Sequence, residues 1–453
     1  MINEQINCKK LDISLSTVAL FEQFAHLPHA ILLDSSNAQH ENSRYDIISI
    51  NPVTVLEARS QHVFLDGNPT RLTWCEMIHH HLTRLCQTPA PFDLPFSGGW
   101  LGYFGYDLGR YIEKLPDYAQ QDIKLPDMVV GLYLDALIKD NLTNTWYYVS
   151  QPSVDNEQSY LSLLNSNDKQ TNITPFRSEN DWVSNLTQVQ YFEKFEQIQA
   201  YLKSGDCYQI NLAQRFSARF TGTPWDAYKK LQTQNKAPFS AFMNLPNGAI
   251  LSVSPERFLL VNGKQVESKP IKGTLPRLED SDADHQQSIK LQHSPKDRAE
   301  NVMIVDLLRN DLGKVAKPGS VCVPKLFHIE SFPAVHHLVS TVTSELADGK
   351  TAVDQLHAAF PGGSITGAPK IRAMEIIEEL EPHRRSVYCG SIGYLSACGR
   401  MDTSITIRTL VCDDQHIYCW AGGGIVADSD ANSEYQETFH KVQKILPILR
   451  TSE

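Results

Sequence analysis

The strongest constraint on the fold is a predicted β-hairpin in the middle of the chain. Residues 257–261 form a strand-like apolar run, and Asn262-Gly263 is a dipeptide typical of the turn between two paired strands. A second strand-like run begins at residue 265 and continues through the segment that contains Lys272. Because a hairpin holds its two strands antiparallel and side by side, the turn brings Glu256 towards Lys272.

The register of this hairpin decides whether Glu256 and Lys272 share one face. A two-residue Asn-Gly loop sets Glu256 opposite Lys269 and leaves Lys272 on the other face, because strand side chains alternate. A three-residue loop with a bulge at Gly263 reverses the parity and puts the two side chains together. A shared site therefore predicts a bulge or a longer loop in the 261–265 turn.

The residues around Lys272 are typical of a closely packed place. Pro270 and Pro276 bracket the segment, and Gly273 with Thr274 suits a turn where backbone can approach closely. An ammonium kept out of water loses part of its preference for the charged form, and a neutral amine is a nucleophile or a base. The alternative from this segment alone is a surface lysine beside a turn, since lysine is seldom buried.

Length, charge and cysteine usage narrow the class of protein. A chain of 453 residues predicts two domains or one large layered domain. Its formal net charge of −11 argues against nucleic acid or an anionic membrane surface as the main partner. The nine cysteines are scattered without a C-x-x-C pair, so neither a disulfide framework nor a zinc site is expected. Without a long apolar run, we expect a cytoplasmic protein with no membrane span.

Sequence patterns divide the chain into three parts. Residues 11–150 mix short strand-like runs with turns and predict an N-terminal domain. Residues 165–181 are polar, with few apolar positions, and predict a linker. Residues 187–448 begin with a helical apolar stripe, continue into strands, and predict a second domain that contains the hairpin.

Two predicted helices carry carboxylates on faces that also carry apolar residues. Ser294-Pro295 gives the first helix an N-cap and a first-turn proline, and Glu300 follows on its apolar stripe. Glu434 and Glu437 lie at i and i+3 on a C-terminal helix. Three inward carboxylates suit Mg²⁺, a hard cation that takes oxygen ligands. The alternative is a solvated helix face, which is usual for glutamates at this spacing.

Glycine-rich segments supply the expected anion sites. Residues 361–370 run directly into a helix predicted over 370–380, so free amides near its start could face an anion. The run A-G-G-G-I-V at 421–426 predicts a second set of exposed amides after a strand. Ordinary tight turns are the alternative for both segments.

Between these segments, a strand-like alternation puts Ser404, Thr406 and Arg408 on one face. An arginine there can bind a carboxylate through two hydrogen bonds. The run around His336-His337 is strand-like, where a histidine is more often structural than catalytic. The sequence contains no Walker A motif, no H-E-x-x-H and no complete G-x-G-x-x-G, so nucleotide-binding and zinc-protease classes lose their main support.

Eight short motifs together resemble the chorismate-utilising enzymes, the family of the anthranilate synthase and aminodeoxychorismate synthase large subunits. The motifs are S-P-E-R-F (254–258), P-I-K-G-T (270–274), D-R-A-E-N (297–301), H-H-L-V-S (336–340), P-G-G-S-I-T-G-A-P-K (361–370), T-I-R-T (406–409), A-G-G-G-I-V (421–426) and E-Y-Q-E-T (434–438). The resemblance covers nearly the whole chain. It implies an α/β (α+β) fold of two antiparallel β-sheets packed face to face with helices outside, with the chorismate-binding catalytic domain at 187–448.

Within this family, P-I-K-G-T with lysine is typical of the enzymes that make 4-amino-4-deoxychorismate, whereas anthranilate synthases usually have P-I-A-G-T. The resemblance therefore implies transfer of ammonia to chorismate, on the route to 4-aminobenzoate and folate. No G-x-C-x-G glutaminase elbow occurs in the chain, so a separate glutamine amidotransferase subunit is implied as the ammonia source. The alternatives are an anthranilate or isochorismate synthase, and a catalytically silent tryptophan-binding subunit.

The resemblance also implies roles for particular residues. Lys272 is expected to attack C2 of chorismate while the C4 hydroxyl departs, with Glu256 as general acid and His337 beside them. Glu300 and Glu437 are expected to hold Mg²⁺, with Glu434 nearby or through water. The expected substrate contacts are Thr274, Thr366, Gly367, Tyr388, Arg408, Gly422, Gly423 and Gly424.

A second site is implied in the N-terminal part, where the family has a pocket that holds tryptophan. Asp34 stands where the feedback-inhibited anthranilate synthases have glutamate, so binding is expected rather than regulation. The residues expected to form the pocket are Ser35, Ser43, Arg44, Tyr45, Pro238, Phe239 and Ser240.

Overall fold

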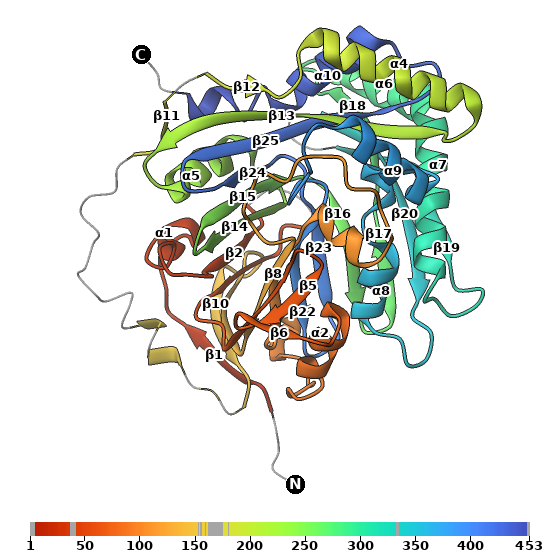
Figure 1. The fold of residues 1–453 in the computed structure, drawn as a ribbon. Coiled ribbons are helices and arrows are strands. Elements are labelled where there is room, and N and C mark those ends of the chain that lie inside the picture. Colours follow the sequence, from red (N-terminus) through yellow and green to blue (C-terminus); the bar gives the residue numbers. More distant parts are fainter. Residues whose placement is uncertain are drawn as a thin grey trace.

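Two large antiparallel β-sheets form the framework of the molecule, one of 13 strands and one of 12 (Figure 1). The computed structural model describes residues 5–36, 42–331 without 153, 155, 159, 162–174 and 180, and 335–450. Side chains of both sheets meet in the largest core cluster, among them Ile138 and Ile250 from the first sheet and Trp100 and Leu259 from the second. The expected fold of two antiparallel sheets with helices is confirmed.

The first sheet carries β13 and β25, the two long strands beside the predicted anion sites. Its strands are, in spatial order, β1 (Asn7–Leu11), β10 (Thr145–Ser150), β9 (Asp135–Asp140), β3 (Tyr45–Ser49), β2 (Ile31–Asp34), β14 (Phe239–Leu245), β15 (Gly248–Ser254), β24 (Thr409–Cys412), β25 (His416–Ile425), β13 (Gln209–Thr221) and β11 (Arg177–Ser178), with β12 (Val183–Ser184) and β21 (Gly367–Ala368) also paired with β13.

The second sheet carries the predicted hairpin, formed by β16 and β17, and the strand of Lys272, β18. Its strands are, in spatial order, β18 (Ile271–Pro276), β20 (Val335–Glu345), β17 (Gln265–Ser268), β16 (Arg257–Asn262), β23 (Met401–Ile405), β22 (Ser391–Ser396), β7 (Gly99–Phe104), β8 (Met128–Tyr133), β4 (Thr54–Arg59), β5 (His62–Leu65) and β6 (Asn68–Thr70), with β19 (Cys322–Ser331) also paired with β20.

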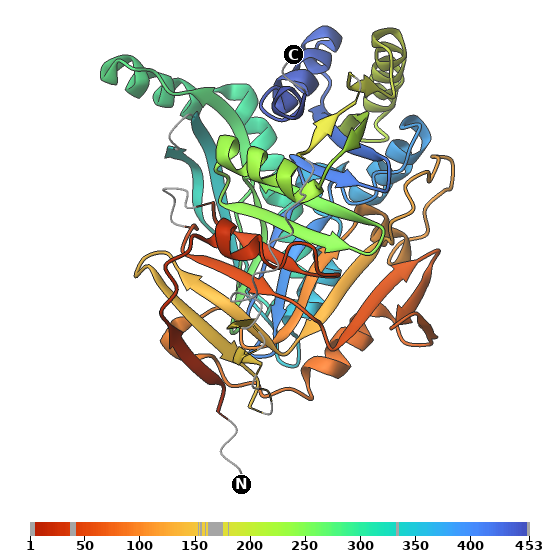
Figure 2. The same cartoon turned by 90° about the vertical axis from the view of Figure 1, so that its left-hand side faces the viewer.

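Helices cover the outer faces, with α4 and α10 beside β13 and β25 and the long helix α7 beside β20 (Figure 1). Helix α6 projects from the same end of the molecule as α4 and α10 (Figure 2). The helices are α1 (Thr17–Phe21), α2 (Trp74–Leu82), α4 (Gln188–Ser204), α5 (Pro224–Asn235), α6 (Ser281–Gln292), α7 (Pro295–Gly313), α8 (Ala352–Ala359), α9 (Lys370–Leu380) and α10 (Ala431–Val442), with short 3-10 turns at η1 (Pro91–Asp93), η2 (Tyr106–Tyr111), η3 (Gly363–Ile365) and η4 (Pro447–Leu449).

Both predicted domains contribute strands to both sheets. In the first sheet β2 pairs with β14, where Asp34 lies opposite Ser240. In the second sheet β7 pairs with β22, where Gly102 lies opposite Gly393. The division into 11–150 and 187–448 stays a prediction, and most of the predicted linker at 165–181 lies outside the described residues.

The helices near the predicted site begin where local signals place them. The side chain of Ser294 caps α7 by accepting a hydrogen bond from the Asp297 amide, as its position before Pro295 predicts. Helix α9 spans the predicted 370–380. Helix α10 carries both Glu434 and Glu437. Capping depends on neighbouring residues, so the sequence specifies these ends directly.

The hairpin is present, but the prediction for its turn is wrong. Asn262 pairs with Gln265 across a two-residue Gly263-Lys264 loop, so the 261–265 turn contains no bulge. The irregularity lies instead in β16, where its register against β23 shifts between Arg257 and Leu259. A bulge reverses which face the flanking residues occupy, and this one directly follows Glu256.

The predicted strand through 404–409 is interrupted. Strand β23 ends at Ile405 in the second sheet, and β24 begins at Thr409 in the first. Residues 406–408 carry the chain between the sheets, and Arg408 has a left-handed φ of 50°. Ser404, Thr406 and Arg408 therefore do not share one strand face, because the chain turns between them.

The prediction of an exposed loop at 421–426 is also wrong, because Gly422–Gly424 lie inside β25. They pair with Ala213, Leu212 and Asn211 of β13. On its other side, β25 pairs with β24 only as far as Leu410 and Cys419, so among the described strands its opposite edge is open at the glycines. The expected amides therefore come from a strand edge.

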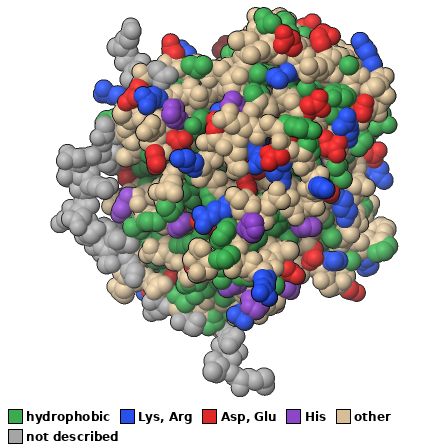
Figure 3. Space-filling model, viewed as in Figure 1, with side chains coloured by type: hydrophobic (Ala, Val, Ile, Leu, Met, Phe, Trp, Pro, Cys, Tyr) green, Lys and Arg blue, Asp and Glu red, His purple; other side chains and the backbone are tan. Residues whose placement is uncertain are grey.

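One face of the molecule shows how charged side chains are distributed on the surface. On the face in Figure 3, acidic and basic side chains are interspersed over most of the molecule. Within the described part of the chain, no helix combines the length and apolar character needed to span a membrane.

Candidate active site

Lys272 and Glu256 contact the same residue, Ser364. The Lys272 ammonium donates a hydrogen bond to the Ser364 carbonyl oxygen at 3.3 Å, and the Ser364 hydroxyl donates one to Glu256 Oε1 at 3.4 Å. Ser364 lies in η3, within the glycine-rich 361–370 segment. The structure therefore brings the two predicted catalytic side chains to one pocket.

Glu256 is buried, with 7% of the residue exposed. Burial raises the pKa of its carboxyl to about 7, although the Lys272 ammonium and the Ser364 hydroxyl both act to lower it. A carboxylic acid with a pKa near neutrality can hold a proton and donate it. Glu256 therefore has the property that a general acid needs.

Lys272 also lies 3.4 Å from Glu300 Oε1, with 15% of its side chain exposed. The next residue, Gly273, has a left-handed φ of 71° at the shift in register between β18 and β20. A Cβ at Gly273 would come within 2.8 Å of Asp297 Oδ1. The segment with Lys272 is thus packed against the start of α7, as its glycine predicts.

Thr274 and His337 face each other across the same strand pair. The Thr274 hydroxyl lies 2.8 Å from His337 Nδ1. The neighbouring His336 instead has its Nε2 3.0 Å from Asp284 Oδ1. Of the two histidines, His337 is therefore the one that contacts Thr274, a predicted substrate contact, and its catalytic role stays a prediction.

The three predicted metal-binding glutamates converge on the glycines of β25. A Cβ built on Gly423 would lie 2.9 Å from Glu434 Oε2 and 3.6 Å from Glu437 Oε1. A Cβ on Gly424 would lie 3.4 Å from Glu300 Oε1. Side chains at these positions would fill the space between the carboxylates, which explains the glycines.

Each glutamate has a polar partner within the protein. Glu437 Oε1 lies 2.7 Å from Lys441 Nζ, and Glu434 Oε1 accepts a hydrogen bond from the Ser429 hydroxyl at 2.7 Å. Burial raises the pKa of Glu434, and the Glu437 carboxylate adds to this effect. Burial acts in the same direction on Glu437, but Lys441 outweighs it and leaves the Glu437 pKa below its ordinary value.

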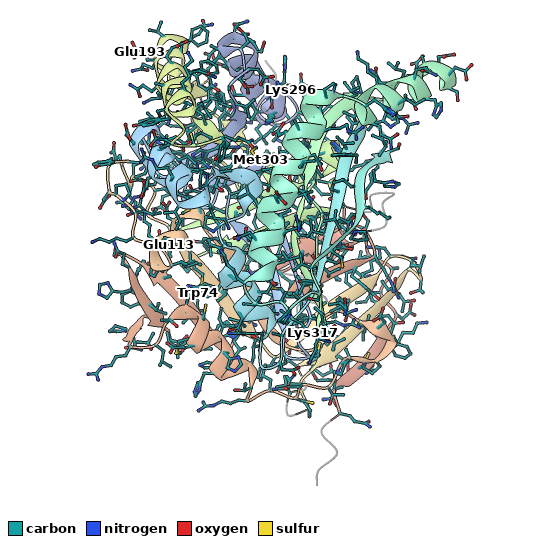
Figure 4. The ribbon with its side chains drawn as sticks, turned by 90° about the vertical axis from the view of Figure 1, so that its right-hand side faces the viewer. Trp74, Glu113, Glu193, Lys296, Met303 and Lys317 are labelled. Carbon is teal, nitrogen blue, oxygen red and sulfur yellow. The ribbon has the colours of Figure 1, made fainter. Side chains whose placement is uncertain are left out.

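Lys296 adds positive charge above the two glutamates of α10. It lies at the end of α7 that faces α10 (Figure 4), and its positive charge acts to lower the pKa of both Glu434 and Glu437, although the net pKa of Glu434 stays raised. The carboxylates are therefore surrounded by lysines from several elements, which is an arrangement that tolerates bound anions near acidic groups.

The donor types in this cluster fit Mg²⁺. Three carboxylates and the amide of Gln209 meet here, and the buried Gln209 Oε1 has no hydrogen-bond partner among the described residues. A buried oxygen of this kind needs a donor, a water or a cation. Within the same residues, no group of three or more His, Cys, Asp and Glu side chains is arranged to hold a metal ion as it stands. The Mg²⁺ site therefore stays a proposal.

Arg408 is a cation without an ion-pair partner among the described residues. Among the residues that the structure describes, its guanidinium has no hydrogen-bond or ion-pair partner, and burial lowers its pKa while Glu256 acts to raise it. A partly buried guanidinium without a partner is costly unless a ligand supplies the anion. Arg408 therefore has the geometry and charge for the carboxylate role that the sequence predicts.

Three other predicted substrate contacts have structural partners. The Thr366 hydroxyl donates to the Gly362 carbonyl at 3.1 Å, which competes with a substrate for that group. The Tyr388 ring stacks on Trp420 at 5.9 Å. Gly367 pairs with Ile210 of β13. Their substrate-binding roles stay predictions.

The predicted second site is a cavity of about 280 Å³, which we call the second cavity and which residues of β16 help to line. Of the residues predicted for tryptophan, Ser43 is buried without lining it, and the others do line it: Ser35, Arg44, Tyr45, Pro238, Phe239 and Ser240. Other lining residues were not predicted, because they come from β16, β22 and β23, far away in sequence: Arg257, Tyr394 and Asp402.

The arginines of this second cavity are paired. Arg257 binds Asp402 through two hydrogen bonds of 2.9 Å, and Arg400 binds Asp93 at 2.5 Å. Asp34, which also lines the cavity, is buried, and its pKa rises to about 7 through burial and the nearby Asp46 carboxylate. The cavity thus presents matched charges, which suits a zwitterion such as an amino acid.

Several functional neighbours were missed by the sequence. Ser364 was inside a predicted anion loop, but its contacts to Lys272 and Glu256 depend on the fold. Lys441 follows Glu437 by four residues, a spacing that also describes an ordinary exposed helix pair. Gln209 precedes a predicted strand interior and gives no signal by itself.

Comparisons with known proteins found a matching family, similar curated proteins and a similar solved structure. A family model described as chorismate binding enzyme matches residues 28–447. The chain is 54% identical over 433 residues to aminodeoxychorismate synthase component 1 of Salmonella typhimurium, covering 94% of each chain. It is 53% identical over 434 residues to the protein of the same name from Escherichia coli K12, covering 95% of each. The solved anthranilate synthase component I from Streptococcus pneumoniae superposes with a TM-score of 0.78 at 30% identity, covering 96% of this chain and 98% of that one.

Proposed function

Because the chain belongs to the family of chorismate-binding enzymes, we propose that it converts chorismate and ammonia to 4-amino-4-deoxychorismate. The observation that carries the proposal is the pair formed by Lys272 and Glu256, which meet at Ser364 in a pocket with an unpartnered arginine. Relatives named aminodeoxychorismate synthase component 1 support the choice of product.

In the proposed reaction Lys272 is the nucleophile. Its neutral amine forms a bond to C2 of chorismate, the ring double bonds shift, and the C4–O bond breaks. Glu256 gives its proton to the departing hydroxyl, which leaves as water. Ammonia then forms a bond to C4 while the double bonds shift back and the C2–N bond to Lys272 breaks. The balance is chorismate plus ammonia to 4-amino-4-deoxychorismate plus water.

Arg408 and the open edge of β25 bind the enolpyruvyl carboxylate in this proposal. The guanidinium can donate two parallel hydrogen bonds to a carboxylate. Gly422–Gly424 leave room for the ligand to approach the backbone. Thr274, His337 and Tyr388 complete the wall of the pocket. Binding two carboxylates here orients C2 towards Lys272 and C4 towards Glu256.

Glu300, Glu434 and Glu437 would hold Mg²⁺. When bound, the ion supplies positive charge for the ring carboxylate of chorismate. Gly423 and Gly424 lie against these glutamates, and because glycine has no side chain, the space beside the three carboxylates stays open.

The nitrogen in the proposal comes from a glutamine amidotransferase subunit, which forms a heterodimer with this chain. The relatives' printed name, component 1, supports a second component. The reaction would serve 4-aminobenzoate and folate biosynthesis in the cytoplasm. The second cavity would hold tryptophan, with its matched arginine and aspartate pairs facing the amino-acid group.

One incubation tests the proposal. The purified chain is mixed with chorismate, Mg²⁺ and ammonium, and the lyase that releases 4-aminobenzoate from aminodeoxychorismate is then added. We expect 4-aminobenzoate only when the lyase is present, and less product when Mg²⁺ is removed with a chelator. Fluorescent anthranilate formed without the lyase would assign an anthranilate synthase, and no turnover would assign a silent tryptophan-binding subunit.

A further inference from the structure

Arg385 is a fully buried charge behind the candidate active site. Only 1% of its side chain is exposed, and it follows the end of α9. Its guanidinium binds the Glu381 carboxylate through two hydrogen bonds, of 2.9 and 2.6 Å. This pairing compensates the buried charge and fixes the plane of the guanidinium.

The remaining N–H groups of Arg385 reach two separate segments. One donates to the Ile365 carbonyl at 3.0 Å, and another donates to the Asn211 carbonyl of β13 at 2.7 Å. Glu381 extends the link, because its Oε1 accepts the Ala213 amide at 2.9 Å. One ion pair therefore joins the end of α9, the strand β13 and the turn η3.

The contact with Ile365 lies one residue from Ser364, the residue that touches both Lys272 and Glu256. The Ser364 carbonyl and hydroxyl face these two side chains, and their directions depend on the backbone that Arg385 holds. The Arg385 guanidinium also lies 5.8 Å from the Tyr388 ring. Lys272 and Arg385 both donate to carbonyls of η3, those of Ser364 and Ile365 respectively.

We propose that Arg385 is a positioning residue, which sets the relative placement of Lys272 and Glu256 through the backbone of Ser364. The inference rests on the proposed function, in which these two side chains act on neighbouring atoms of one substrate. Arg385 itself contacts no substrate. Lysine cannot replace it, because an ammonium on a flexible chain lacks the planar fork that holds two carbonyls and a carboxylate at once.

The test compares Arg385→Lys with Arg215→Lys. Arg215 is also buried and binds one carboxylate, that of Asp122, through two hydrogen bonds of 2.7 Å, but it donates to no residue of the candidate site. For Arg385→Lys we expect kcat to fall about 10- to 100-fold with little change in the KM for chorismate, because a shift of about 1 Å in reacting groups costs about this much. Arg215→Lys should lose comparable thermal stability and retain kcat.

A double-variant cycle separates positioning from general loosening of the fold. Ser364→Ala removes the hydroxyl bound to Glu256 and keeps the carbonyl bound to Lys272, so the part of the Arg385→Lys loss that passes through Glu256 should disappear in its presence, and the combined loss should be below the product of the two single losses. With Arg215→Lys the losses should multiply. Equal kcat losses for the two arginine variants, or a multiplicative cycle with Arg385→Lys, would overturn the inference.

The wild-type chain provides the separate check on the proposed function. If the wild type makes aminodeoxychorismate and Arg385→Lys has the same kcat as the wild type, only the positioning inference falls. If the wild type turns over no chorismate, the proposed function falls and takes this inference with it.

Discussion

The candidate active site and the second cavity differ in whether their charged side chains are paired within the protein. Glu256 faces the candidate active site, and the next residue, Arg257, lines the second cavity. In the second cavity Arg257 is paired with Asp402 and Arg400 with Asp93, so these two arginines are neutralised without a ligand. In the active site Arg408 has no partner among the described residues, and Glu256 is buried with a raised pKa. A site that performs chemistry keeps groups poised for a ligand, whereas a site that only binds can satisfy its own charges.

The largest expected effect that tests this contrast is the loss of Lys272. Lys272→Ala should lower the rate of 4-amino product by about 10³-fold or more, since removal of a nucleophile removes the covalent route. Residual activity can shift towards ammonia attack at C2, which gives anthranilate chemistry. The products are separated by chromatography. Lys264→Ala, an exposed lysine on the same hairpin, is the control, and full retention of 4-amino product in Lys272→Ala would remove the covalent role.

The next largest effect is expected from removing Arg408, which has no partner among the described residues, in contrast to the paired Arg257. Arg408→Ala should lower kcat/KM about 100-fold and leave the melting temperature unchanged, because its guanidinium holds the substrate and no protein group. Arg257→Ala should instead destabilise the fold by about 2 kcal/mol, because partly exposed Asp402 loses its partner. Thermal melts and steady-state kinetics on both variants check this. A stability loss in Arg408→Ala equal to that in Arg257→Ala would contradict the contrast.

The pH profile sharpens the active-site half of the comparison. The pKa of Glu256 is raised to about 7, so the group is a protonated acid below this pH and loses its proton as the pH rises through it. Above this point kcat/KM should fall about tenfold per pH unit, because the general acid is lost. Glu256→Gln should be slow and should lack this limb. If kcat/KM of Glu256→Gln still falls above pH 7, the titrating group is another residue.

The smallest effect on turnover is expected in the second cavity. Phe239 lines it and lies 5.0 Å from the Arg257 guanidinium, so Phe239→Ala should weaken tryptophan binding about tenfold through lost aromatic contact. Turnover of chorismate should stay near the wild-type rate. Calorimetry with tryptophan measures the affinity, and Phe92→Ala, an exposed aromatic outside the cavity, is the control. Unchanged affinity in Phe239→Ala would show that tryptophan is not the occupant.

Much of the local structure was predictable. Helices α7 and α9 begin at the residues that Ser294 and Pro369 mark, because capping and proline restriction act within a few residues of the chain. The three glutamates were found on helices by their spacing. Sequence patterns failed at the 261–265 turn and at 421–426, because strand register and sheet edges depend on partners from β23 and β13.

The sequence by itself determined the chemical groups of this protein and the helices that carry them. It contains the lysine, the carboxylates, the arginine and the glycines, in motifs whose local spacing defines turns and helix ends. Only the tertiary structure decided which of these groups meet. Glu256 and Ser364 are 108 residues apart, and Lys272 and Ser364 are 92 apart. Contacts over such separations depend on how two sheets pack, and on a bulge in β16 that only its pairing with β23 reveals.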